Sequence, residues 1–194
     1  RIFLKIEIQK IMTTIINRSL TLDEFLKLPE TKPVREYING EIITKPMPKG
    51  KHSRLQLRLC NSINDITESE KIAYAFPELR CSFGVRSVVP DIAVLKWSNI
   101  PFTAEGEVPN DFLIPPDWTI EILSPEQSIA KPTKNILHCL NHGTSLGWLI
   151  IPEEYNIIIY PQNQQPIYLE NETDILPVPE IMKDLHLTLG ELFE

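Results

Sequence analysis

The segment Val88–Leu95, which reads VVPDIAVL, decides how this sequence is interpreted, because it places Asp91 inside an apolar run that is otherwise typical of a buried β-strand. A second apolar run, Trp118–Ser124 (WTIEILS), is interrupted in the same way by Glu121. Burying a charge is costly unless that charge is paired or bound to a metal ion. Two such carboxylates in two predicted strands therefore indicate a functional site.

The two strands are expected to present their carboxylates to a hard cation. Asp91 begins its strand directly after a proline, and Glu121 shares one face of its strand with Thr119 and Leu123. If the strands are neighbours, both carboxylates converge at one end of the sheet, where they could hold Mg²⁺ together with water. Two other interpretations stay open: Asp91 bonds to nearby backbone, and Glu121 faces solvent on an edge strand.

The sequence around these strands predicts a mixture of short helices, strands and hairpins. A short helix is expected where Thr21 and Glu24 match a capping box. Asn39 followed by Gly40, between two alternating stretches, is typical of a type I′ hairpin. Further short strands are expected near residues 72–76, 80–85, 88–95 and 118–123.

Two longer segments are predicted to be helices. Residues 52–66 are periodic as a helix and, over their first half, also alternate as a strand would; the longer pattern favours a helix capped by Ser53. A second helix is expected over residues 132–143, because Pro132 suits the first helical position and Gly143 a C-terminal cap.

This order of elements predicts an α/β fold with a central mixed β-sheet, flanking helices and added hairpins. Residues 19–194 are interpreted as a single domain, which a chain of 194 residues allows. Residues 1–18 are interpreted as an N-terminal extension, either flexible or lying upstream of a native start at Met12.

Composition restricts the classes of function. The net charge of −7 argues against broad, non-specific nucleic-acid binding but allows a local basic groove. The three cysteines lie far apart without zinc or pairing spacing, which indicates a reducing, cytoplasmic location. No apolar run approaches the length of a membrane span, and no Ser-His-Asp elbow, Walker loop or dinucleotide glycine pattern is present.

One stretch departs from the acidic character of the chain. Between Ile42 and Asn64 there is no acidic residue. The basic residues of this stretch are Lys45, Lys49, Lys51, Arg54 and Arg58. Together with Lys131 and Lys134 they could line a groove that follows a phosphate backbone, although a run of charges is more often a solvated face.

The ordered combination of VVPDIAVL, PPDWTIEILSPEQS and HGTSLGWLII, preceded by REYINGEIITKPMPKGKHSRL, resembles the Uma2 (DUF820) family, which is widespread in cyanobacteria. The resemblance extends over about residues 20–194. It implies the PD-(D/E)XK fold, which is a restriction-endonuclease-like core, and a nuclease-type site.

The resemblance also implies roles for individual residues. Asp91 and Glu121 would be the acidic ligands of Mg²⁺ or Mn²⁺, with Glu41 of the hairpin and the following His52 beside them. Two plainer interpretations stay open: Glu41 is a solvated hairpin residue, and His52 simply begins a helix.

The chain departs from the superfamily motif at its lysine. The position two residues after the motif glutamate is Leu123, and the resemblance implies that a lysine on the next helix takes over. Lys134, in the first helical turn, is the first candidate, and Lys131, which precedes Pro132, is the second. Members of the family often carry an aspartate just before this helix, and the residue at that position here is Ser128.

The function expected from these observations is Mg-dependent phosphodiester hydrolysis by an endonuclease, with DNA as the first choice of substrate over RNA. A homodimer is expected, because many nucleases of this fold pair to cut two strands. The alternative is a nucleic-acid-binding or accessory protein that keeps the fold with weak or no catalysis, which the displaced lysine and the acidic net charge favour.

Overall fold

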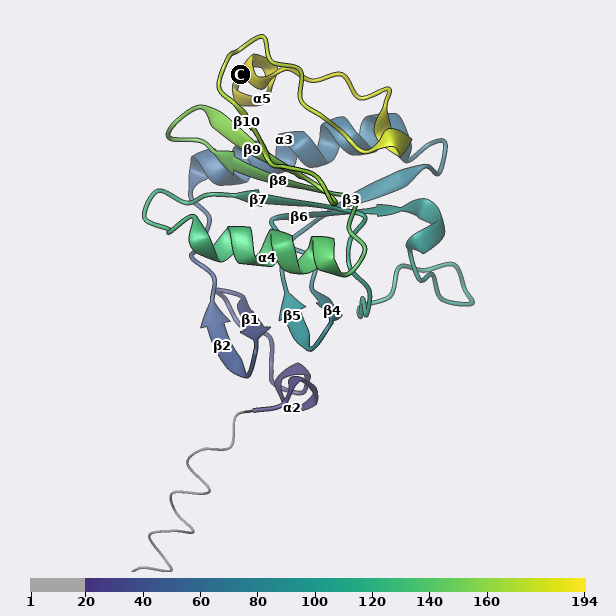
Figure 1. Ribbon diagram of the computed structural model, residues 1–194. Helices are drawn as coiled ribbons and strands as arrows, with labels where there is room; N and C mark the ends of the chain where they lie inside the picture. Colours follow the sequence, from purple (N-terminus) through teal and green to yellow (C-terminus); the bar gives the residue numbers. More distant parts are fainter. Residues whose placement is uncertain (1–19) are drawn as a thin grey trace, which may run out of the picture.

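A computed structural model describes residues 20–194, and the expected N-terminal extension at 1–18 lies outside the described residues. The described part contains a six-stranded sheet in the order β10-β9-β8-β7-β6-β3 and a four-stranded sheet in the order β2-β1-β5-β4 (Figure 1). Within residues 20–194, every helix is too short or too polar to cross a lipid bilayer.

The elements have the following bounds. The helices are α2 (Leu22–Leu26), α3 (Gly50–Thr67), α4 (Ala130–Asn141) and α5 (Leu189–Phe193), with 3-10 turns at η1 (Trp97–Asn99) and η2 (Glu180–Met182). The strands are β1 (Arg35–Ile38), β2 (Glu41–Thr44), β3 (Ala73–Pro77), β4 (Cys81–Phe83), β5 (Arg86–Val88), β6 (Ile92–Lys96), β7 (Trp118–Ile122), β8 (Leu146–Ile151), β9 (Asn156–Pro161) and β10 (Ile167–Leu169).

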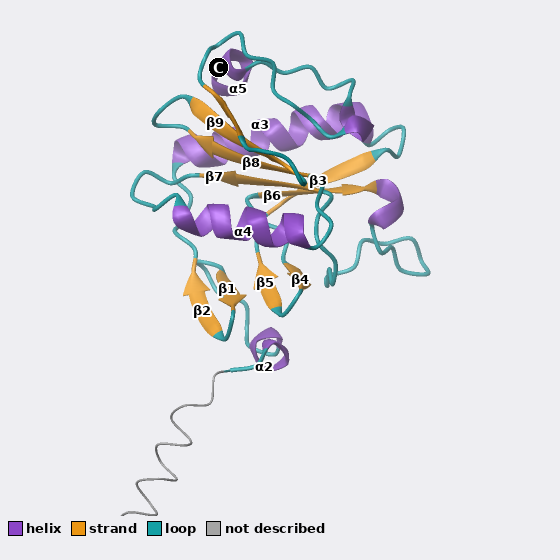
Figure 2. Ribbon diagram, viewed as in Figure 1, coloured by secondary structure: helices purple, strands orange, loops and turns teal. Residues whose placement is uncertain are grey.

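The larger sheet is mixed, as the sequence predicted. Strands β7 and β8 are parallel, whereas β3–β6, β6–β7, β8–β9 and β9–β10 are antiparallel. Helix α3 covers one face of this sheet and α4 the other (Figure 2). The expected α/β architecture with flanking helices and hairpins is therefore confirmed.

Alternation along β7 decides which side chains meet which helix. Ile120 and Ile122 lie in one buried cluster with Leu59 and Ile63 of α3. The residues between them point to the opposite face, where α4 packs. Glu121 is consequently directed toward α4 rather than toward the large apolar cluster.

Helix α4 lies close against β8 at a glycine. A side chain at Gly147 would collide with Ile136, which is fully buried in α4. The missing side chain lets the helix approach the sheet at this position, and this approach fixes the height of α4 above the carboxylates.

Residues 88–95 were predicted to form one strand, but the structure divides them between two strands. Strand β5 of the small sheet ends at Val88, and β6 of the large sheet begins at Ile92. The chain crosses from one sheet to the other at Val89, Pro90 and Asp91, and Pro90 has no N–H to continue a ladder. Asp91 therefore lies at the junction of the two sheets.

The predicted hairpin and capping box are confirmed. Asn39 and Gly40 adopt φ values of 53° and 92°, as a type I′ turn requires. Thr21 caps α2 by accepting from the Glu24 amide, with the reciprocal bond also present.

Two helix starts differ from the prediction. Helix α3 begins at Gly50 with Lys49 as its N-cap, so Ser53 lies inside the helix. Helix α4 begins at Ala130, which makes Pro132 its third residue rather than its first. Proline is tolerated there because N–H groups of the first turn have no partner within the helix.

Candidate active site

Asp91 is held on both sides by backbone and side-chain groups. Its Oδ2 accepts from the Ile122 amide at 2.7 Å, and its backbone oxygen accepts from Gln56 Nε2 at 2.6 Å. The residue is only 3 % exposed. These bonds fix the carboxylate in one orientation and leave Oδ1 as the oxygen available to other groups.

Glu121 faces the same space from the middle of β7. Ile92 pairs with Ile120 in the β6–β7 ladder, so Asp91 and Glu121 continue that register opposite one another. Asn135 of α4 donates to Glu121 Oε1 over 3.4 Å. The expectation that the two carboxylates lie on adjacent strands and on one face of the sheet is met by this geometry.

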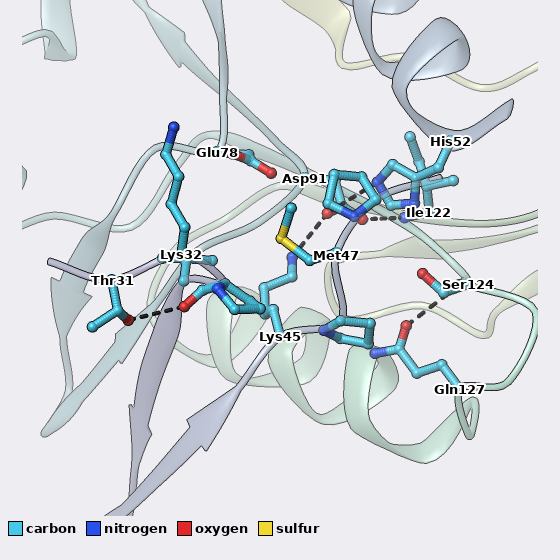
Figure 3. Close-up of a pocket in the computed structure, with 14 residues that line it drawn as sticks. Thr31, Lys32, Lys45, Met47, His52, Glu78, Asp91, Ile122, Ser124 and Gln127 are labelled. Carbon is cyan, nitrogen blue, oxygen red and sulfur yellow. Dashed lines mark hydrogen bonds and ion pairs between the residues drawn. The ribbon is translucent and has the colours of Figure 1, made fainter. Parts of the chain in front are cut away.

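Lys45 brings a positive charge between these carboxylates. It follows the last residue of β2, and its Nζ lies 2.8 Å from Asp91 Oδ1 and 3.4 Å from Glu121 Oε2. The same ammonium donates to the Val89 backbone oxygen at 2.7 Å. Figure 3 shows the side chain extending from the hairpin segment to Asp91.

A second buried glutamate adjoins this group. Glu36 of β1 has no exposed surface, and its Oε1 accepts from the Val89 amide at 3.0 Å and from Asn135 Nδ2 at 3.1 Å. Lys131 Nζ lies 3.2 Å from Glu36 Oε2, at ion-pair distance but outside hydrogen-bond geometry. Asn135 thus bridges the hairpin glutamate and the strand glutamate.

His52 approaches from the first turn of α3. Its Nε2 lies 3.4 Å from Asp91 Oδ1, close enough for an ion pair although the angle does not make a hydrogen bond. Neither ring nitrogen has a hydrogen-bond partner within residues 20–194, and the residue is 8 % exposed. A buried imidazole without partners is a group that a substrate or water would complete.

The charges shift the pKa values in opposite directions. Burial acts to lower the pKa of Lys45, but attraction by Asp91 and Glu121 outweighs it and leaves that pKa above its ordinary value. Burial acts to raise the pKa of Asp91, but the ammonium of Lys45 outweighs it and holds that pKa below its usual range.

Glu121 behaves differently although it contacts the same ammonium. Burial raises its pKa to about 8, against the attraction of Lys45 and with the added repulsion of Asp91 and Glu36. Lys45 lies farther from Glu121 than from Asp91, at 3.4 Å against 2.8 Å, and the repulsion by Asp91 and Glu36 opposes its attraction. Strongly shifted groups gathered at one buried position are characteristic of functional sites.

A pocket of about 290 Å³ opens beside this group. Its lining includes Lys45, His52 and Asp91 together with Met47 and Gln127. Figure 3 shows Lys45, His52 and Asp91 meeting at its base. A ligand entering the pocket would therefore reach the carboxylate, the ammonium and the imidazole together.

The donor set fits a hard divalent cation. Asp91 Oδ1, Glu121 Oε2 and the Val89 carbonyl already surround one positive charge, and oxygen atoms are the ligands that Mg²⁺ takes. No cluster of three or more His, Cys, Asp or Glu side chains arranged for a metal occurs within the described part of the chain. Magnesium commonly uses one or two carboxylates, completed by water and substrate phosphate.

Two predicted site residues lie elsewhere. Glu41 is exposed at the start of β2, next to the hairpin turn, and the hairpin glutamate that reaches the site is Glu36. Lys134 is exposed on α4, whereas Lys131 lies beside Glu36, so of the two lysines Lys131 is nearer to the buried carboxylates. The sequence predicted that Lys131 precedes the helix, but it is the second residue of α4.

Most of the side chains predicted to form a basic groove do not line this pocket. Arg54 and Arg58 donate to the backbone oxygens of Glu194 and Glu191, and Lys51 to that of Pro152. These side chains hold the C-terminal helix α5 and the β8–β9 connection to α3. From the basic stretch, Lys45 is the side chain that contacts the carboxylates.

Three residues of the site were not anticipated as site residues. Lys45 carried only the signal of its basic stretch, and Glu36 shares a strand face with Ile38. Asn135 lies four residues after Lys131, on the same face of α4, which is the one signal that sequence offered for it.

Comparisons with known proteins identify the family of the chain. Residues 22–190 match the family Uma2, described as "putative restriction endonuclease". A crystal structure of "a putative nuclease belonging to DUF820" from Anabaena variabilis ATCC 29413 is 55 % identical, with a TM-score of 0.87 over 89 % of this chain and 97 % of that one. No curated protein matched. The chain belongs to the Uma2 (DUF820) family.

Proposed function

We propose that the protein is a metal-dependent nuclease that hydrolyses phosphodiester bonds, with DNA as its substrate. The observation that carries this proposal is the meeting of Asp91 and Glu121, from adjacent strands and on one sheet face, around a single cation position beside a pocket. Membership of a family described as "putative restriction endonuclease" supports it.

The residues would divide the work as follows. Asp91 and Glu121 would hold Mg²⁺ or Mn²⁺, which supplies positive charge for the phosphate and lowers the pKa of water. His52, which lies at ion-pair distance from Asp91 but has no hydrogen-bond partner on either ring nitrogen within residues 20–194, would orient the attacking water or the phosphate. Hydrolysis adds the water oxygen to phosphorus and breaks one P–O ester bond, and the departing oxygen takes up a proton.

The second candidate is an accessory protein that binds nucleic acid without efficient catalysis. The absence of lysine at position 123 and the ammonium of Lys45 between the carboxylates favour it. The three cysteines are buried and unpaired, which supports a reducing cytoplasmic location under either proposal. A homodimer remains our proposal for the assembly.

A cleavage assay separates the two candidates. Supercoiled DNA, single-stranded DNA and RNA are incubated with the parent, Asp91→Asn and Glu121→Ala, each with Mg²⁺, Mn²⁺ or chelator. The nuclease proposal expects metal-dependent products from the parent and at least about 100-fold slower cleavage by both variants. Binding without cleavage on every substrate would favour the accessory protein. Cleavage unaffected by both variants would reject this site.

A further inference from the structure

The ammonium of Lys45 occupies a position built from oxygen atoms. A lysine ammonium has three donors, and here they meet Val89 O at 2.7 Å, Asp91 Oδ1 at 2.8 Å and Glu121 Oε2 at 3.4 Å. Carbonyl and carboxylate oxygens of this kind are also the ligands of hard divalent cations. An internal cation thus fills the position that the proposed metal needs.

The two cations cannot share this position. Asp91 Oδ2 accepts from the Ile122 amide and Oδ1 from Lys45, so a cation placed between Asp91 and Glu121 would compete with the ammonium for Oδ1. A second positive charge on the same oxygens would meet the ammonium at close range, where repulsion is strong in a poorly solvated interior. A divalent cation can bind both carboxylates only after the ammonium has left.

The surroundings give the ammonium a place to go. The backbone of Lys45 is fixed by the bond from its amide to Val34 O, but its four-carbon side chain is flexible. The side chain lines the 290 Å³ pocket that also contains His52 and Met47. A displaced ammonium would therefore lie in the pocket, where a phosphate of the substrate would be bound.

We infer that Lys45 supplies the lysine that position 123 lacks, holding the cation position in the metal-free protein and moving onto the substrate phosphate when a divalent cation binds. This inference rests on the proposed function for the identity of the substrate. The exchange itself is a property of the metal-free and metal-bound protein.

The first test measures the affinity for Mg²⁺ by calorimetry. An ammonium that fills the position in about nine of ten molecules weakens the apparent affinity about tenfold, so Lys45→Met and Lys45→Gln should bind Mg²⁺ about tenfold more tightly than the parent. Titrations at pH 7.5 and pH 9, below and above the pKa of about 8 of Glu121, distinguish competition by a proton on Glu121 from competition by the ammonium of Lys45. Lys32→Met is the matched control, because exposed Lys32 lines the same pocket without contacting either carboxylate.

The second test uses the parent protein and needs no folded variant. Lysines are acetylated with a limiting reagent and quantified by peptide mass spectrometry, in chelator and in saturating Mg²⁺. Lys45 should react much more slowly than Lys32 in chelator, and Mg²⁺ should raise the reactivity of Lys45 alone. For the calorimetry of the first test, Lys45→Gln retains a polar side chain and replaces Lys45→Met if that variant proves unstable.

The outcomes are distinct for the two proposals. Tighter binding in both Lys45 variants, with Mg²⁺-dependent exposure of Lys45, supports the exchange even if no nucleic acid is cleaved. Equal or weaker binding in the variants, no binding in any of the proteins, or Lys45 reactivity that Mg²⁺ leaves unchanged would overturn it. Metal-dependent cleavage alongside such a negative result would leave the proposed function standing.

Discussion

Asp91 and Glu121 lie opposite one another across the β6–β7 register, and the same ammonium contacts both of their carboxylates. When both carboxylates are ionised, the pair carries two negative charges against one positive charge and Glu36 adds to the repulsion; with burial, this raises the pKa of Glu121 to about 8, so Glu121 holds a proton below that pH. Without a further cation this arrangement disfavours the ionised form of Glu121, and the cost should be measurable in the free energy of unfolding.

Glu121→Gln should stabilise the metal-free protein at neutral pH. The substitution keeps the shape and replaces a carboxyl whose ionised form is disfavoured by burial with a neutral amide, while Lys45 keeps its bonds to Asp91 and to the Val89 oxygen. Removing a strained active-site charge commonly gains about 0.5–2 kcal/mol of unfolding free energy. Urea denaturation in chelator measures the difference, and strong destabilisation would mean that Glu121 is a structural hydrogen-bonding residue.

The gain should depend on pH in a defined direction. The pKa of Glu121 is raised from 4.5 to about 8 by folding, so between these values the folded state holds a proton that the unfolded state has released. Stability from this group is present at low pH and is lost as pH rises toward 8. The advantage of Glu121→Gln should grow over that range and then level off, whereas exposed Glu153→Gln should show no such trend.

Lys45→Met should destabilise the metal-free protein. It leaves two buried carboxylates without their shared cation, and breaking a buried ion pair costs about 3–5 kcal/mol. Adding Glu121→Gln to this variant should restore part of the loss, because one uncompensated charge is then removed. A double-mutant cycle by urea denaturation gives the coupling energy, and strict additivity would contradict the shared contact.

The two lysines of α4 should behave differently. Lys131→Met removes the cation beside the fully buried Glu36, and leaving such a group without its partner costs about 1–3 kcal/mol. Lys134→Met, on an exposed side chain, should change stability by less than about 0.5 kcal/mol. Denaturant titrations of both variants check this, and equal effects would show that the ion pair with Glu36 contributes nothing.

Two glycines provide a further matched pair. Gly147→Ala introduces a methyl group against Ile136 and should cost about 1–3 kcal/mol through overpacking. Gly50→Ala, with open space at the first residue of α3, should be neutral or stabilise by up to about 1 kcal/mol. Thermal melts of the two variants should therefore shift in opposite directions or by clearly unequal amounts.

The sequence revealed the two carboxylates because each interrupts an apolar strand. Their neighbours could not be found in this way. Lys45 and Glu36 reach the site only because the small sheet meets the larger one where the chain passes from β5 to β6, and that placement depends on contacts between distant segments. Local periodicity carries no information about such packing.

The geometry of α4 explains why Lys131, rather than Lys134, lies beside a buried glutamate. Helix α4 begins two residues earlier than the proline at position 132 suggested. Lys131, Asn135 and His138 are spaced by four and three residues and so share a face, which is directed toward the site and the small sheet. Lys134 is three residues after Lys131 and four before His138, so it lies at the border of that face, where its side chain is exposed.

The crossing between the two sheets at Val89 and Asp91 is fastened by the site itself. Glu36 receives the Val89 amide, Lys45 donates to the Val89 carbonyl, and Asp91 receives the Ile122 amide. Selection that preserves the architecture therefore also preserves these side chains, independently of any chemistry they perform. In a relative that has ceased to cleave nucleic acid, Glu36, Lys45 and Asp91 would still be retained as the fastening between its two sheets.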